Sequence, residues 1–384
     1  MKKHLSRRLV LLFLLPLLLC ALCPRVAAEE EVDTALPEEY AALLEALPDE
    51  VITRLPDGFF SQDGESVADA TREAFDLSSL LSTLGELVGL HLGDALALLA
   101  STLGLLLLSA LLRALCAEGG SEGVLRAFSF CASLSLTLAL IRGGGKVLSH
   151  VEGYFESLNA ISAALLPLSG VLYAMGGNTG AAVASSAGLS VYMTVLEELV
   201  GKSILPFCAI CLLLALLRAV APDARTASLG ATVKKNYTTA LSFLMMLLLA
   251  MIAAQTTLAS HADTLAMRSV KFAAGSWIPV VGGSLAELLR TVSTGVGYLR
   301  GTVGVSGVLF LLLLLLPMLV ELFLFRLVWQ LSAAVADLLG CERERGLLEE
   351  FTSLHGYLIA AVAICSSVLL LSMTLLLTTA SAIG

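Results

Sequence analysis

The stretch VGVSGVLFLLLLLLPMLVELFLF, residues 303–325, is apolar throughout except for Ser306 and Glu321. A transmembrane helix needs about 20 consecutive apolar residues, so this stretch predicts a helix that spans a membrane. The whole chain agrees, because 57% of its residues are hydrophobic, 14% are charged and the mean hydropathy is +0.90. These values exclude a soluble domain of 384 residues. They predict an all-α, polytopic membrane protein.

Several further apolar runs approach the length of a membrane span, so we expect six to eight transmembrane helices. Some are short or glycine-rich, and residues 161–200 fit either two full spans or one re-entrant pair. The additional candidate spans are 95–112, 124–141, 161–176, 181–200, 203–221, 239–258 and 356–380.

The N-terminus predicts a secretory signal peptide over residues 1–28. Basic residues precede an apolar run from Leu9 to Cys20, and the small residues Ala27 and Ala28 provide a cleavage site. Cleaved or retained as an anchor, this segment places residue 29 outside the cytoplasm. An acidic extracytoplasmic segment, 29–94, and a multi-spanning membrane domain, 95–384, are expected to follow.

The acidic segment carries more than half of the chain's 32 Asp and Glu residues. Pro37 opens a short helical pattern that ends at Pro48, with Tyr40 among the residues on its apolar face. Two interpretations remain open: a solvated spacer, or a docking segment for another extracytoplasmic protein.

Proline and histidine recur at offsets of about 111 residues, which predicts an internal duplication. The repeats would be parallel and cover about 124–235 and 236–345. Proline removes a helical hydrogen bond, so we expect repeated bends. The residues concerned are Pro167, Pro206, Pro279 and Pro317.

Charge predicts the orientation of the spans, because cytoplasmic loops collect cations. One short loop is surrounded by four cations, Arg218, Arg225, Lys234 and Lys235. This loop is therefore expected in the cytoplasm. The connection between the spans 95–112 and 124–141 is expected on the same side.

Three amphipathic stripes, within 147–158, 285–296 and 328–338, predict helices lying in the membrane interface. The alternative is that they pack on the rim of the protein itself. The second stripe is the candidate assembly surface for partner proteins and consists of Leu285, Leu288, Leu289, Val292 and Val296.

No catalytic constellation is evident. The histidines are scattered without an HExxH pattern, and neither a GxSxG elbow nor a Walker lysine loop occurs. The sequence therefore predicts no catalytic, cofactor-binding or metal-binding residues, and no enzyme. It also shows no basic patch for nucleic acid.

Charge inside the predicted spans is sparse, and such charge is kept mainly for function. Glu321 lies within 303–325 and is expected either to pair with Arg326 or to reach the interface. His150 and His261 occupy equivalent repeat positions, which suggests a proton relay. Both lie on amphipathic stretches, which favours polar-face residues instead.

The stretches GGNTG at 176–180 and KFAAGSWIPVVGG at 271–283 complete an ordered set with the signal sequence, the acidic segment and the leucine-rich run. In this combination the chain resembles the stage III sporulation protein AE family of endospore-forming bacteria. The resemblance implies a subunit made in the mother cell and placed in the membrane that faces the forespore. It implies ring-forming proteins and a secretion-type ATPase of the same operon as partners, in a transenvelope channel that sustains late forespore gene expression. It supplies no catalytic residues and no cofactor.

Two principal hypotheses follow. The first is a non-enzymatic scaffold or export-gate subunit of that channel, with membrane lipids and other membrane proteins as partners. The second is a stand-alone permease with a midplane site near Glu321. A membrane enzyme acting on lipid or peptidoglycan is a remote third, because a catalytic cluster is missing.

Overall fold

The protein is described here by a computed structural model, which covers residues 36–55, 57–60, 77–117, 122–175, 200–220, 228–247 and 282–381 and a few isolated positions elsewhere. Within 282–300 it describes the backbone alone. The described residues form helices and turns without a strand, which confirms the all-α prediction.

In the described part of the chain, four helices are long and apolar enough to cross a membrane. They are α5 (Leu77–Ala117), α6 (Glu122–Met175), α10 (Gly282–Leu338) and α11 (Glu342–Ser381). A shorter apolar helix, α8 (Ile204–Val220), coincides with the predicted span 203–221. The predicted spans 181–200 and 239–258 lie largely outside the described residues.

α6 joins segments that the sequence analysis separated. The predicted spans 124–141 and 161–176, and the amphipathic stripe between them, form one continuous helix of 54 residues. The glycines between the two runs do not end the helix, since each glycine costs a helix interior only about 1 kcal/mol. The stripe at 147–158 is thus the middle of α6, and its apolar residues Val147, Val151 and Leu158 are buried within the protein.

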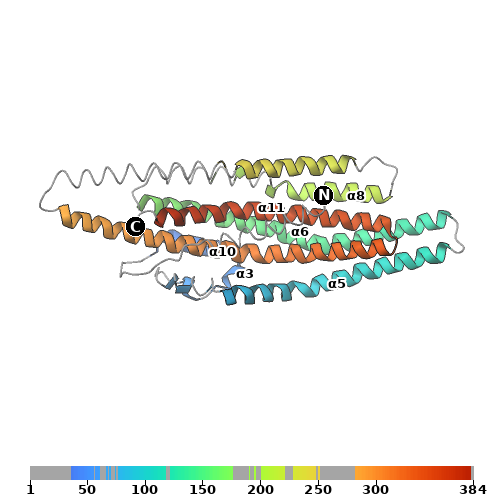
Figure 1. The fold of residues 1–384 in the computed structure, drawn as a ribbon, viewed down its shortest axis with the longest axis horizontal. Coiled ribbons are helices and arrows are strands. Elements are labelled where there is room, and N and C mark those ends of the chain that lie inside the picture. Colours follow the sequence, from blue (N-terminus) through green and yellow to red (C-terminus); the bar gives the residue numbers. More distant parts are fainter. Residues whose placement is uncertain are drawn as a thin grey trace.

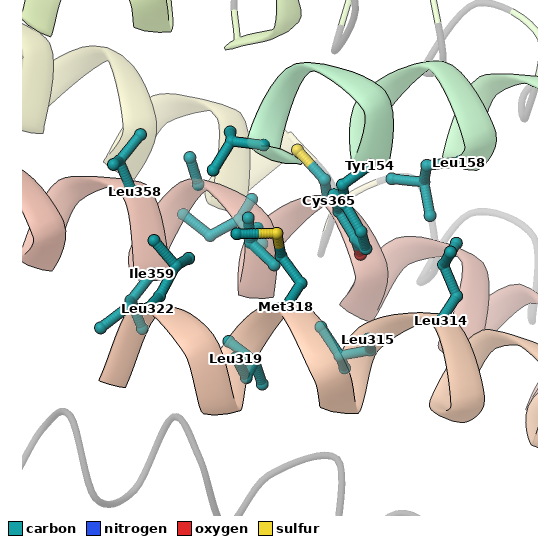
Figure 2. Packing of buried hydrophobic residues seen from close by; sticks show 14 of the residues in the cluster. Tyr154, Leu158, Leu314, Leu315, Met318, Leu319, Leu322, Leu358, Ile359 and Cys365 are labelled. Carbon is teal, nitrogen blue, oxygen red and sulfur yellow. The ribbon is translucent and has the colours of Figure 1, made fainter. Parts of the chain in front are cut away.

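α10 lies at the centre of the bundle. Its residues 308–316 are all buried, because α5, α6 and α11 pack around it. Figure 2 shows Leu315, Met318 and Leu322 of α10 facing residues of α11 and α6. At Gly307 the approach is so close that a Cβ would lie 2.8 Å from Sδ of Met373.

α10 and α11 form a tight antiparallel hairpin. Gly340 has a φ of 67°, and the amide of Cys341 donates to the carbonyl of Ala336 at 2.8 Å. This six-to-one hydrogen bond, with glycine in the left-handed conformation, is a Schellman ending.

The helix ends predicted to lie in the cytoplasm gather at one end of the bundle. Figure 1 shows the end of α5 and the start of α6 at the same end of the bundle as the α10–α11 turn. Ala215, near the C-terminus of α8, packs on Leu347 near the start of α11.

The short N-terminal helices pack against α10. They are α2 (Glu38–Glu45), α3 (Asp49–Ile52) and the 3-10 helix η1 (Asp57–Phe60). α2 is the short helix that the sequence predicted between Pro37 and Pro48. The rings of Tyr40 and Phe59 lie 6.4 and 5.5 Å from that of Phe310. Burial raises the pKa of Tyr40 above its ordinary value. Part of the acidic segment is therefore docked on the bundle.

Candidate functional site

A polar pair connects the middles of α6 and α10. Nδ1 of His150 lies 2.8 and 3.0 Å from the two carboxylate oxygens of Glu321. The Glu321 side chain is 7% exposed and that of His150 is 55% exposed. An ionised carboxylate can only accept a hydrogen bond, so Nδ1 of His150 donates to it.

The surroundings of this pair are apolar. Glu321 follows the leucine-rich part of α10, and its neighbours Val320 and Leu322 are buried. A buried carboxylate requires a partner, and His150 provides one from a helix more than a hundred residues away in sequence. The imidazole side of the pair remains accessible.

Arg326, the partner expected for Glu321, lies elsewhere. Its guanidinium packs over Gly356 of α11, where a Cβ would lie 3.4 Å from Nη1. Five residues separate Glu321 from Arg326, which turns the two side chains about 140° apart on a helix, whereas facing pairs are three or four residues apart. The structure thus gives His150 as the partner of Glu321. Burial of Arg326 leaves its Nε without a hydrogen-bond partner among the described residues.

His355 is fully engaged in packing. Nε1 of Trp329 donates to Nε2 of His355 at 3.3 Å, and Nδ1 of His355 donates to the carbonyl of Phe351 at 3.0 Å. An imidazole with one donated and one accepted hydrogen bond is the neutral form. His355 therefore joins α10 to α11 and has no free nitrogen for chemistry.

A second buried carboxylate, Glu344, fastens α5 to the α10–α11 hairpin. Nη2 of Arg113 donates to Oε2 of Glu344 at 2.6 Å, and the hydroxyl of Ser109 donates to Oε1 at 2.9 Å. Nη1 of Arg113 also donates to the carbonyl of Gly340 at 3.1 Å. Glu344 is 1% exposed, and the guanidinium of Arg113 neutralises its buried charge. We call this group the hairpin clasp; the sequence analysis did not predict it.

Residues 228–247 form another helix, which α11 and α8 hold in place. Lys234 forms a salt bridge with Glu350 of α11. The ring of Tyr237 stacks on Phe207 of α8, with centroids 3.9 Å apart. Lys234, one of the cations that predicted a cytoplasmic loop, thus also has a structural partner.

The remaining predicted site residues are distributed along the helices. The predicted assembly surface lies in the first turns of α10, whose backbone is helical and whose side chains lie outside the description. Pro167 and Pro317 lie inside the continuous helices α6 and α10. Pro206 lies in the first turn of α8, where proline is tolerated, and Pro279 lies outside the described residues.

The donor side chains of the bundle were expected to form no metal site. In the described part of the chain, no three His, Cys, Asp or Glu side chains come together as a metal site. The charged groups around Glu321 and Glu344 each contain a single carboxylate.

Known proteins were compared with the whole chain. The family model for stage III sporulation protein AE matches residues 65–380. The stage III sporulation protein AE of Bacillus subtilis (strain 168) is 24% identical over 226 residues, which cover 58% of this chain and 57% of that relative. The chain thus matches little more than half the length of the relative. No solved structure matches. Because the family model covers most of the chain, the resemblance seen in the sequence is confirmed, and the chain belongs to the stage III sporulation protein AE family.

Proposed function

We propose that the protein is a non-enzymatic membrane subunit of a sporulation-specific transenvelope channel that links mother cell and forespore and sustains late forespore gene expression. The observation that carries this proposal is family membership over residues 65–380, combined with four helices able to cross a membrane. Membership supports a role in sporulation, and the helices support a location in a membrane.

The arrangement of helix ends supports an orientation across that membrane. The turn between α10 and α11 lies at one end of the bundle, and the N-terminal helices dock around Phe310. Along α10, Phe310 is about 42 Å from Leu338 at roughly 1.5 Å per residue. This distance is comparable to the thickness of a bilayer including its headgroups. With the basic ends in the cytoplasm, the acidic segment faces the space between the two cells.

The proposed partners are the ring-forming proteins and the secretion-type ATPase of the same operon. The proposed contact is the predicted assembly surface in the first turns of α10. These turns lie on the Phe310 side of the bundle, away from the hairpin, and so extend toward the intermembrane space in this orientation.

Affinity purification tests the proposal. A tagged full-length chain would be isolated from mildly solubilised sporulating cells, and the co-purifying proteins identified by mass spectrometry. We expect the ring proteins and the ATPase above the level recovered with an unrelated tagged membrane protein. Recovery of the chain alone, or only with itself, would contradict the subunit role.

The pair between His150 and Glu321 favours a second candidate, a stand-alone permease. A buried carboxylate with a half-exposed imidazole partner is a group that can couple transport to proton movement. Purified protein in liposomes would then move a solute by itself. The channel-subunit proposal remains the stronger, because family membership over residues 65–380 supports it, whereas the permease rests on this pair alone.

A further inference from the structure

The exposed face of α6 is polar over more than four turns. Its exposed polar residues recur every three or four positions, while Val147, Val151, Tyr154 and Leu158 on the opposite face are buried. We call this face the polar strip; it comprises Arg142, Lys146, Ser149, His150, Glu152, Glu156 and Asn159.

Three contacts fix the level of the polar strip on the bundle. Next to Arg142, a Cβ on Gly143 would lie 2.6 Å from Cδ1 of Leu98, so the start of the strip lies beside Leu98 of α5. Further along, His150 pairs with Glu321 of α10. Leu87 of α5 packs on Leu316 and Val320, adjacent to Glu321. The strip from 142 to 150 therefore runs alongside residues 87–98 of α5.

The exposed face of α5 at this same level is apolar on the side of Leu92 and Leu96, whereas the exposed carboxylates Glu86 and Asp94 lie one turn before and one turn after Leu90. Leu90 is 68% exposed, Leu92 41% and Leu96 54%. Exposed leucines continue along α5 to Leu115, about 37 Å from Leu90 at roughly 1.5 Å per residue, which matches the thickness of a bilayer. The side of α5 that carries Leu92 and Leu96 is suited to lipid, and the strip from 142 to 150 lies at the level where the exposed leucines begin.

α6 itself changes character at Arg142. Nearer the hairpin end of the bundle its exposed large residues are apolar, and they include Phe130, Leu138 and Ile141. From Arg142 onward the exposed face carries two cations and then two carboxylates, Glu152 and Glu156. At membrane depth, charged side chains face a protein interior or a water-filled cavity rather than lipid.

We propose that the polar strip is one wall of a water-filled conduit enclosed by further copies of this chain, arranged around an axis along the membrane normal. The inference rests on the proposed function and deepens it, because it assigns the strip to the aqueous path of the channel. Rings of like side chains at successive levels are a common lining of membrane pores.

The charge pattern favours copies of the chain over a strongly charged partner. Arg142 and Lys146 balance Glu152 and Glu156, so the strip offers no net charge to attract such a partner. In copies related by an axis along the membrane normal, each charge faces its own kind at the same level. Direct contact would bring like charges together, whereas water between them screens the repulsion.

Cysteine labelling at matched depth tests this proposal. Ser149→Cys on the polar strip and Leu92→Cys on the apolar face of α5 would each be placed in a full-length chain whose native cysteines are replaced. Both variants are first required to support sporulation, which shows that they fold. Membranes that contain this chain without its operon partners are then treated with a charged, membrane-impermeant maleimide.

We expect Ser149→Cys to react at least about tenfold faster than Leu92→Cys, because a thiol forms the reactive thiolate more readily in water than in apolar surroundings. A bifunctional maleimide should also link copies through position 149 and not through position 92. Equal fast labelling would place this level outside the bilayer and overturn the proposal. Equal slow labelling, labelling only with the operon partners present, or a failure to link copies would also overturn it. Partner co-purification is a separate readout, so a failure here is distinguishable from a failure of the proposed function.

Discussion

The hairpin clasp gives the sharpest prediction about stability. Arg113→Met removes the cation that neutralises Glu344, which is 1% exposed and would keep only the hydroxyl of Ser109. Removing one partner of a buried ion pair costs about 3–5 kcal/mol. Arg113 is itself 26% exposed, so water weakens its interaction, and we expect a loss at the lower end, about 3 kcal/mol.

Two related variants separate the charge from the hydrogen bonds. Glu344→Gln keeps a side chain of the same size and leaves Arg113 able to reach water, so we expect it to cost about 1–2 kcal/mol. The double variant should cost about 1–2 kcal/mol less than the sum of the two single variants, since both remove the same interaction. Arg345→Met is the matched control. Its partner Asp337 is 62% exposed, and its loss should leave the free energy of unfolding unchanged within error.

The assay is titration of SDS into protein in mild detergent micelles, with unfolding followed by far-UV circular dichroism. The midpoints and slopes give the free energy of unfolding of each variant. A neutral Arg113→Met, or an Arg345→Met variant that loses as much stability as Arg113→Met, would refute the argument that burial makes the clasp important.

Three other predictions concern the turn, the assembly surface and the buried pair. Gly340→Ala should lower the free energy of unfolding by about 1 kcal/mol in the same SDS titration, because φ there is 67°, whereas Gly346→Ala, in a helix with open space, should not lower it. A gain in stability from Gly340→Ala would contradict the Schellman turn. Replacing both Leu288 and Val292 with Asp should abolish capture of operon partners in a pull-down while membrane insertion is retained; unchanged capture would remove the assembly-surface assignment. If the protein is a channel subunit, Glu321→Gln should not affect solute uptake into liposomes. If the wild-type chain alone takes up solute and Glu321→Gln stops this uptake, the permease would be favoured.

Much of the fold follows from the sequence because apolar length is a local property. The run 303–325 and the runs at 95–112 and 356–380 all lie in long helices of the structure. Pro37 and Pro48 likewise bracket α2, since proline acts on the residues beside it. The continuity of α6 was missed, because the glycines between its apolar runs weaken a helix without ending it.

The polar contacts were harder to predict because they join distant parts of the chain. His150 and Glu321 are 171 residues apart, and Ser109 and Glu344 are 235 apart. Sequence proximity favoured Arg326 for Glu321, although the helical angle between positions five apart turns them away from each other. The sequence did contain one signal. Glu321 is the only charged residue within 303–325, so a buried partner had to come from another part of the chain.

We propose that this chain serves a complex that sustains gene expression in the forespore. The most direct measurement compares a late forespore-specific reporter with an early one in sporulating cells that carry or lack the chain. We expect that loss of the chain leaves the early reporter normal and sharply reduces the late one, and that the wild-type chain restores the late reporter. A late reporter of normal strength in cells without the chain would contradict the account.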